Sequence, residues 1–166
     1  RRFLNLFGYT GSMTVCAAGG GAAATTTVDL SATYLGWAER NLALNNLMGP
    51  HHEFVRADCL EWIDSARGAP KSYDLVFLDP PTHSRSKRMQ NDFDVQRDHV
   101  RLIERTADLL APGGLLIFSC NYTRFRLDRD ALAGFSIADI TAATIPKDFA
   151  RSPRIHVCYE ITRRAE

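Results

Sequence analysis

Short apolar segments rich in strand-forming residues alternate along most of this chain with segments of helical periodicity. Strands are predicted over residues 3–7, 24–30, 53–57, 73–78 and 115–119. Such alternation is typical of a parallel sheet whose strands are connected by helices. Because 166 residues is the length of one ordinary domain, we expect residues 1–166 to form a single α/β domain.

Helical periodicity fills the stretches between these strands. Helices are predicted over residues 12–18, 31–45, 59–66, 95–110 and 127–133, and a polar loop over residues 82–94. Towards the C-terminus, two strand-like segments, residues 137–145 and 154–163, follow each other without a helix between them. Two consecutive strands of this kind predict an antiparallel hairpin at the edge of the sheet.

The composition excludes several classes of protein. Hydrophobic residues make up 45% of the chain and charged residues 23%, which is typical of a globular protein and not of a disordered one. No apolar run approaches the roughly 20 residues that span a membrane. With a formal net charge of +1, the chain could bind nucleic acid only through a local basic patch.

The four cysteines, Cys16, Cys59, Cys120 and Cys158, lie far apart in the sequence without a CxxC pair. This spacing favours reduced thiols in the cytosol over a disulfide framework or a zinc site. We expect Cys16, Cys59 and Cys158 to serve in packing. No pattern at the start indicates a signal peptide, and the chain begins with Arg1 instead of methionine. We therefore expect a cytoplasmic segment of a longer polypeptide.

Three sequence features fall at the predicted carboxyl ends of the strands, where open α/β sheets bind their ligands. A glycine-containing turn, residues 8–12, follows the first strand, Asp29 ends the second and Asp58 follows the third. An acidic side chain after the second strand can accept hydrogen bonds from ribose hydroxyls. These features predict a nucleoside-type cofactor, although both aspartates could instead cap the helices that follow. The turn lacks the third glycine of G-x-G-x-x-G, which makes a nicotinamide dehydrogenase a distant alternative.

Two segments at this end resemble motifs of the class I S-adenosylmethionine (SAM) methyltransferases. Residues 5–12 (NLFGYTGS) resemble their first motif, and residues 79–82 (DPPT) resemble their fourth. More narrowly, the chain resembles the C-terminal methyltransferase domain of the bacterial bifunctional 23S rRNA guanine methyltransferases, the RlmKL family. That likeness is carried by residues 25–29, 37–41, 79–82, 86–89, 93–99, 149–151 and 155–156.

The resemblance implies a Rossmann-like class I methyltransferase fold. In that fold, a mostly parallel seven-stranded sheet has the strand order 3-2-1-4-5-7-6, an antiparallel last strand and helices on both faces. SAM is the implied cofactor. The residues implied to bind it are Phe7, Tyr9, Thr10, Gly11, Ser12, Asp29, Leu30, Asp58, Cys59 and Asp79. In this assignment the first turn holds the methionine part of SAM, Asp29 holds the ribose, and Asp58 with Cys59 flanks the adenine.

The resemblance further implies methyl transfer to N7 of a guanine in 23S rRNA, with Asp79, Pro80 and Pro81 as the catalytic residues. Guanine N7 has an in-plane lone pair and no proton, so the reaction needs alignment of the reactants more than a general base. Carbon-5 of cytosine differs, because its methylation requires a thiolate that attacks C6. Cys120, after the fifth predicted strand, is the candidate nucleophile of such a cytosine-5 methyltransferase, or else a buried packing residue. A second alternative is a SAM-binding RNA module without catalysis.

Basic residues gather in three predicted loops at the same end of the sheet. The candidate RNA-binding residues are Arg85, Lys87 and Arg88, then Arg124 and Arg126, then Arg151 and Arg154. The aromatic residues among them, which could stack on an unpaired base, are Phe93, Tyr122, Phe125 and Phe149. The partners implied by the resemblance are 23S rRNA or a large-subunit assembly intermediate, together with other domains of the same polypeptide, and no membrane.

Overall fold

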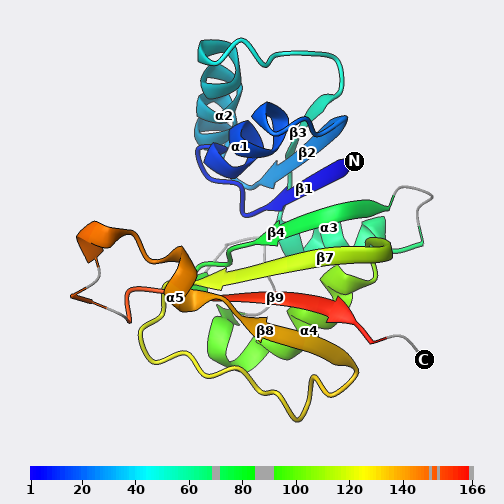
Figure 1. Ribbon diagram of the computed structural model, residues 1–166. Helices are drawn as coiled ribbons and strands as arrows, with labels where there is room; N and C mark the ends of the chain where they lie inside the picture. The colour runs from blue at the N-terminus through cyan, green and yellow to red at the C-terminus, as the bar shows by residue number, and fades with distance from the viewer. Residues whose placement is uncertain (69–71, 85–91, 150, 153, 165–166) are drawn as a thin grey trace.

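A seven-stranded sheet forms the centre of the computed structural model, which describes residues 1–68, 72–84, 92–149, 151–152 and 154–164 (Figure 1). Its strands are β1 (Arg2–Leu6), β2 (Ala24–Asp29), β3 (His52–Arg56), β4 (Tyr73–Leu78), β7 (Leu110–Cys120), β8 (Phe135–Asp139) and β9 (Val157–Arg163). The strand order is β3-β2-β1-β4-β7-β9-β8, and only β9 runs antiparallel to its neighbours. Counted along the chain within this sheet, the order is 3-2-1-4-5-7-6, which confirms the predicted topology.

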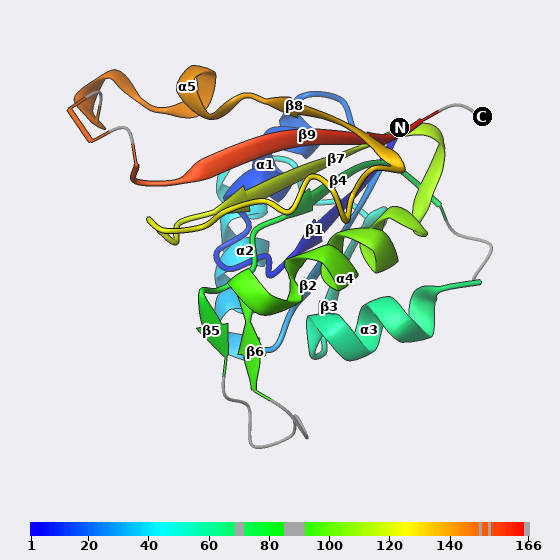
Figure 2. The same ribbon diagram turned by 90° about the horizontal axis from the view of Figure 1, so that it is seen from below.

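Two pairs of helices cover the two faces of the sheet (Figures 1 and 2). Helices α1 (Ser12–Gly19) and α2 (Ala32–Leu44) lie together on one face, beside β1, β2 and β3. Helices α3 (Cys59–Ala66) and α4 (Val95–Ala107) lie together on the other face. The prediction of helices on both faces is confirmed. In the described parts of the chain, no helix is long and apolar enough to cross a membrane.

Strand β1 shows how alternate side chains anchor the two helical layers. Leu4 and Leu6 are fully buried in the main hydrophobic core, which includes Ile63 of α3. Asn5 points to the opposite face, where its Nδ2 donates a 3.0 Å hydrogen bond to Oγ1 of Thr14 in α1. Both faces of β1 are therefore buried, as is typical of a central strand in a parallel sheet.

Residues 127–133 do not form the predicted helix and run instead as a loop followed by turns. The side chain of Asp128 accepts a 2.9 Å hydrogen bond from the backbone N–H of Ala131. Bonds of this kind offer the backbone an alternative to the hydrogen bonds of a continuous helix.

The strand predicted over residues 137–145 is wrong in its second half. Strand β8 ends at Asp139, and the short helices α5 (Thr141–Thr144) and η1 (Lys147–Phe149) follow. The Asp139 carboxylate accepts a 2.9 Å hydrogen bond from the Thr141 N–H, and this turn stops the strand.

The connection after β4 also differs from the prediction. The expected loop over residues 82–94 contains the short antiparallel strands β5 (His83–Ser84) and β6 (Phe93–Asp94). Helix α4 ends at Ala107, before the predicted residue 110, and β7 begins at Leu110, before the predicted residue 115. None of these differences moves the ends of the central strands. Because β1 pairs in parallel with β2 and β4, the carboxyl ends of these three strands lie together at one edge of the sheet.

Candidate functional site

The turn between β1 and α1 has an unusual backbone. Phe7, Tyr9 and Gly11 all have positive φ angles, of 56°, 46° and 73°. Residues other than glycine rarely adopt this left-handed conformation, and such residues cluster at functional sites. The Gly8 N–H donates to the Val28 carbonyl at 3.0 Å, and the Gly11 N–H donates to the Gly8 carbonyl at 2.8 Å. The first-motif turn is therefore a fixed backbone loop at the end of β1.

Close packing makes both glycines of this turn necessary. A Cβ at Gly8 would lie 2.4 Å from Cγ2 of Thr27, and a Cβ at Gly11 would lie 2.4 Å from Cβ of Ala38. Asn41 in α2 adds a 2.9 Å hydrogen bond from its Nδ2 to a backbone carbonyl of the turn. Helix α1 begins here without a side-chain cap, so the N–H groups of its first turn suit an anionic group such as a carboxylate.

Asp29, at the end of β2, lies against this turn. Its Oδ2 accepts a 2.9 Å hydrogen bond from the Tyr9 N–H, and its Oδ1 accepts a 2.8 Å bond from the Ser31 N–H. These bonds hold the carboxylate in place and leave each oxygen a further lone pair. Asp29 is not the cap of α2, because Ser31 is the N-cap and accepts from the Tyr34 N–H at 3.3 Å. The arrangement suits a pair of ribose hydroxyls.

Asp58 and Cys59 brace the structure beside this turn. Asp58 caps α3, and its Oδ1 accepts from two backbone N–H groups of the first helical turn at 2.8 and 3.4 Å. Cys59 is 3% exposed, and its Sγ accepts from the Phe7 N–H at 3.2 Å. Burial raises the pKa of this thiol. The Cys59 side chain therefore supports the turn from inside, while Leu30 lies open at the surface with 38% exposure.

The fourth motif begins where β4 ends. Asp79 and Pro81 are exposed at the rim, and Pro80 between them is buried. The Asp79 carboxylate is hydrogen-bonded to the side chain of Ser119, near the end of the neighbouring strand β7. Although Asp79 is open to solvent on one side, partial burial removes water from its carboxyl group. This desolvation raises the pKa of the carboxyl. The Ser119 bond and the positive potential of His156 oppose that increase.

Sequence reasoning missed a polar cluster on the β9 side of Asp79. Ser119 is paired in register with Cys158 of β9, and His156 immediately precedes this strand. Nε2 of His156 lies 2.8 Å from Oγ1 of Thr144, which connects α5 to β9. The likeness at residues 155–156 was a signal for His156, but no spacing in the sequence links Thr144 to Asp79.

Cys120 ends β7 and is fully buried. Its Sγ accepts a 3.4 Å hydrogen bond from the Tyr122 N–H. Burial raises the pKa of the thiol, and the nearby charge of Asp79 raises it further. A nucleophilic cysteine needs an accessible sulfur and a lowered pKa, so these surroundings favour a packing role.

Residues 93–99, which carry much of the sequence likeness, form β6 and the start of α4. Asp94 is the N-cap, and its Oδ1 accepts from the Arg97 N–H at 2.9 Å. Asp98 reaches back and accepts from the Asp94 N–H at 2.9 Å. The Arg97 guanidinium beside Asp98 lowers the pKa of the Asp98 carboxyl. The two aspartates thus satisfy backbone donors reciprocally, as a capping box does.

Gln96 and His99 connect α4 to the loop that follows β7. The Gln96 side chain donates to the Arg126 carbonyl and accepts from the Arg126 N–H, both at 2.8 Å. His99 is 2% exposed, and its Nε2 accepts from the Asp128 N–H at 3.0 Å. Its Nδ1 must then carry the proton that bonds the Gln96 carbonyl at 2.9 Å. His99 is therefore a neutral structural histidine.

The predicted RNA-binding arginines that the structure describes are all exposed: Arg124, Arg126, Arg151 and Arg154. The other three predicted residues, Arg85, Lys87 and Arg88, lie outside the described residues. Arg124 and Arg126 follow β7, and Arg151 and Arg154 precede β9. Because β9 runs antiparallel to β7, both pairs lie at the edge of the sheet where Asp79 lies.

The prediction of base-stacking aromatics needs correction. Phe93 is 3% exposed, with its ring centroid 6.4 Å from that of Phe7. Phe125 is 8% exposed and packs edge-on against His99 at 5.0 Å. Both rings belong to the core and present no face to RNA. Phe149 remains open, with 53% exposure.

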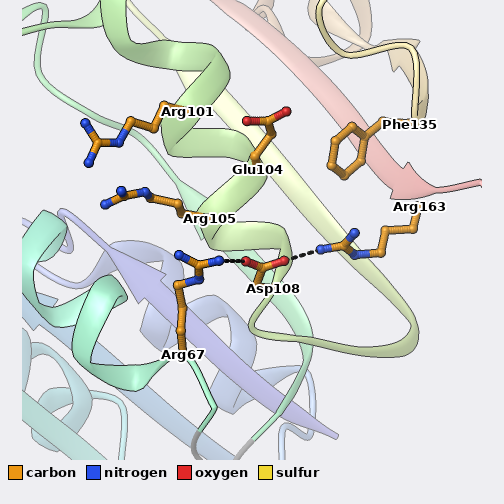
Figure 3. A pocket seen from close by; sticks show the side chains of 7 residues that line it. All are labelled: Arg67, Arg101, Glu104, Arg105, Asp108, Phe135 and Arg163. Atoms are coloured by element: carbon orange, nitrogen blue, oxygen red, sulfur yellow. Dashed lines mark hydrogen bonds and ion pairs between the residues drawn. The ribbon is translucent and has the colours of Figure 1, made fainter.

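An open polar hollow lies at the opposite edge of the sheet, where α3 and α4 end (Figure 3). Asp108 lies between Arg67 and Arg163, with Nη2 of Arg67 2.7 Å from Oδ2 and the Arg163 guanidinium on the other oxygen. Arg105 pairs with Asp64. Because these side chains pair with one another, away from the carboxyl ends of the parallel strands, the hollow is a structural ion-pair cluster. The described residues contain no group of His, Cys, Asp or Glu side chains that could hold a metal ion.

Comparison with known proteins agrees with this geometry. The family model for S-adenosylmethionine-dependent methyltransferases matches residues 1–149. The ribosomal RNA large subunit methyltransferase K/L of Allochromatium vinosum is 61% identical over 97% of this chain. The protein of the same name from Methylococcus capsulatus is 58% identical over 97% of this chain. The chain spans only 22% of the length of each of these relatives.

A solved structure of a methyltransferase complexed with S-adenosylhomocysteine (SAH) has a TM-score of 0.82 with this fold. The two chains are 28% identical, and the match covers 96% of this chain and 44% of the other. Sequence and fold thus lead to the same family. The chain belongs to the family of S-adenosylmethionine-dependent methyltransferases.

Proposed function

We propose that this chain transfers a methyl group from SAM to N7 of a guanine in 23S rRNA, as the catalytic part of a longer polypeptide. The observation that supports rRNA as the substrate is the high sequence identity, over nearly the whole chain, to proteins named as ribosomal RNA large subunit methyltransferases. The polypeptide binds its RNA substrate either as free 23S rRNA or within a large-subunit assembly intermediate. Other domains of the polypeptide add RNA-binding surface.

The geometry after β1 and β2 supports a SAM site at this end of the sheet. The uncapped start of α1, with Thr10 and Ser12 beside it, suits the carboxylate of the methionine part. The carboxylate of Asp29 keeps free lone pairs for the two ribose hydroxyls. Leu30 offers an exposed apolar side chain to one face of the adenine, and Asp58 lies at the end of the next strand. The residues present fit the cofactor.

The fourth motif supplies the wall of the base pocket. When SAM is bound, it supplies a methyl group on a positively charged sulfur, and in-line displacement requires N7 to approach along the line of that bond. Pro80 and Pro81 give the rim a rigid backbone that limits where the base can lie. Methylation at N7 would leave a positive charge on the purine. The Asp79 carboxylate, held by Ser119, stabilises that charge through the transfer.

The cytosine-5 alternative requires Cys120 to act as a thiolate. Its sulfur is fully buried, and burial together with Asp79 raises its pKa. Both observations favour the guanine reaction, in which no covalent bond to the enzyme forms.

The deciding experiment combines the full-length polypeptide with labelled SAM and unmodified 23S rRNA, followed by mass analysis of the product nucleosides. We expect 7-methylguanosine, and we expect Asp79→Ala to abolish its formation. A 5-methylcytidine product would overturn the proposal and assign Cys120 as the nucleophile. Retained SAM binding without any methylated nucleoside would indicate the non-catalytic RNA module instead.

A further inference from the structure

We propose that Tyr9, Tyr34 and Trp37 form a stacking surface for unpaired bases of the RNA substrate, beside the SAM site. We call these three side chains the aromatic ladder. The inference rests on the proposed function, because it names a second contact for the same RNA. None of the three residues belongs to the basic and aromatic loops from which sequence reasoning predicted RNA contact.

The rings of the aromatic ladder touch one another in sequence. The ring centroids of Tyr9 and Tyr34 are 4.5 Å apart, with an interplanar angle of 68°. Those of Tyr34 and Trp37 are 6.3 Å apart, with an angle of 56°. The three residues are 55%, 36% and 44% exposed in chain order. The ladder is therefore one continuous aromatic surface whose rings remain open to solvent.

Packing of the fold does not require these rings. Helix α2 faces the sheet with Leu35, Ala38 and Leu42, which are all buried. Tyr34 and Trp37 lie one helical turn apart on the flank of the same helix. Contiguous exposed aromatic surface on a protein usually marks an interaction site. The ladder is such a surface at the carboxyl edge of the sheet.

The ladder begins at the SAM site. The backbone N–H of Tyr9 donates the 2.9 Å hydrogen bond to Asp29, so the residue that carries the first ring also holds the predicted ribose carboxylate. The positive φ of Tyr9, 46°, belongs to a turn whose hydrogen bonds and close packing fix its backbone. Trp37, in the second turn of α2, extends the surface away from the cofactor. Bases stacked on the ladder would therefore approach the SAM site from the side of Asp29.

The charges beside the ladder fit the phosphates of RNA better than an apolar protein surface. Arg40, exposed one helical turn beyond Trp37, offers a guanidinium at the outer end. Arg56 is held at the inner end, where its Nε donates to the Leu30 carbonyl at 3.4 Å. Glu39 is the exposed carboxylate next to Arg40. Aromatic rings flanked by arginines are the combination that binds single-stranded nucleic acid with little dependence on sequence.

The test uses the full-length polypeptide and measures its Kd for an unpaired oligoribonucleotide by fluorescence anisotropy at several salt concentrations. We expect Tyr34→Ala and Trp37→Ala each to weaken binding by about five- to a hundredfold, since each removes a stacking platform. Trp37→Phe should retain most of the affinity. Leu44→Ala is the matched control, because Leu44 lies on the same helix with 78% exposure outside the ladder, and it should leave Kd unchanged.

Salt dependence separates stacking from phosphate contact. Trp37→Ala should leave the slope of log Kd against log salt unchanged, whereas Arg154→Ala should reduce that slope by about one. The affinity for SAM should stay the same in the Tyr34 and Trp37 variants. An unchanged Kd for RNA in both alanine variants would overturn the inference. So would a fall in Tm together with new protease cleavage, because that result would show that another part of the polypeptide covers the ladder.

The proposed function and the ladder fail separately. If the wild-type polypeptide makes no 7-methylguanosine but its RNA affinity depends on Trp37, the guanine-N7 activity is wrong and the ladder stands. If it makes 7-methylguanosine and the Trp37 and Tyr34 variants bind RNA as the wild type does, the ladder is wrong and the activity stands.

Discussion

The two halves of the carboxyl edge of the sheet are built in different ways. In the half formed by β1 and β2, backbone N–H groups make the decisive contacts, as in the bonds from Tyr9 and Ser31 to Asp29. In the half formed by β4, β7 and β9, side chains from separate segments meet one another, as Thr144 and His156 do. The first half depends on the path of the backbone. The second depends on which side chains are present.

This difference determines which substitutions damage each half. A backbone site tolerates many side-chain changes but fails when its turn cannot form. A side-chain site loses one contact at a time, because each bond contributes about 1 kcal/mol to the free energy of unfolding.

Gly11→Ala should disrupt the backbone half as a whole. The added Cβ would lie 2.4 Å from Cβ and 2.9 Å from Cα of Ala38, at a φ of 73° that alanine rarely adopts. We expect a loss of about 2 to 4 kcal/mol in the free energy of unfolding, measured by urea denaturation, together with loss of SAM binding. Gly36→Ala is the control in α2, where no atom lies within 4 Å, and it should stabilise the helix. Normal SAM affinity in Gly11→Ala would contradict the backbone account.

Gln96→Ala should damage only the side-chain half. It removes both 2.8 Å hydrogen bonds to the backbone of Arg126. We expect a loss of about 1 to 2 kcal/mol in the free energy of unfolding and faster amide exchange around residues 125–128. SAM affinity should not change. Glu104→Ala, an exposed substitution on the same helix, should change the free energy of unfolding by no more than about 0.5 kcal/mol. It should leave amide exchange around residues 125–128 unchanged. Unchanged amide exchange in Gln96→Ala would show that the loop does not depend on this contact.

The same contrast explains what could be predicted from the sequence. The turn after β1 and Asp29 at the end of β2 follow from local turn chemistry and the general rule for parallel sheets, whereas the strand order was implied by the family resemblance. Tyr9 and Asp29 are 20 residues apart, yet adjacent parallel strands bring them together without any special side-chain packing.

The other half could not be predicted because its contacts join distant segments. The sequence does not show that Gln96 would bind the loop 30 residues later, or that Thr144 would meet His156. Nor does it distinguish a loop phenylalanine that stacks on RNA from one that packs inward, as Phe93 and Phe125 do. Besides Phe149, the exposed rings that the structure describes include Tyr9, Tyr34 and Trp37, which lie outside the loops predicted to contact RNA.

Cys120→Ala should have a modest effect on stability. It leaves a small cavity and removes the acceptor of the Tyr122 N–H, for a loss of about 1 kcal/mol in the free energy of unfolding. The rate of methyl transfer should remain near that of the wild type, because the buried thiol takes no part in the proposed reaction. Cys16→Ala, at an exposed cysteine, is the control and should change neither stability nor rate. Loss of turnover in Cys120→Ala alone would favour the cytosine-5 reaction.

Asp79→Asn should have the smallest effect on stability and the most informative pH dependence. Because folding raises the pKa of this carboxyl above 3.8, the folded state binds its proton more tightly than the unfolded state does. The wild type therefore loses stability as pH rises from the ordinary aspartate pKa to the higher folded value. Asparagine keeps an acceptor for Ser119 and does not ionise, so the variant avoids that loss.

The difference in Tm between Asp79→Asn and the wild type measures the stability that the wild type loses when the Asp79 carboxyl ionises. The variant should be slightly more stable at neutral pH, with the difference shrinking as pH falls towards 3.8. The rate of methyl transfer should be lower in Asp79→Asn than in the wild type, because the charge that costs stability is the one proposed to act on the purine. The opposite sign, a less stable variant at neutral pH, would mean that the interactions of the carboxylate with Ser119 and its other neighbours outweigh the cost of partial burial. The side-chain half would then be held together by its charges, and Asp79 would be as much a structural residue as a catalytic one.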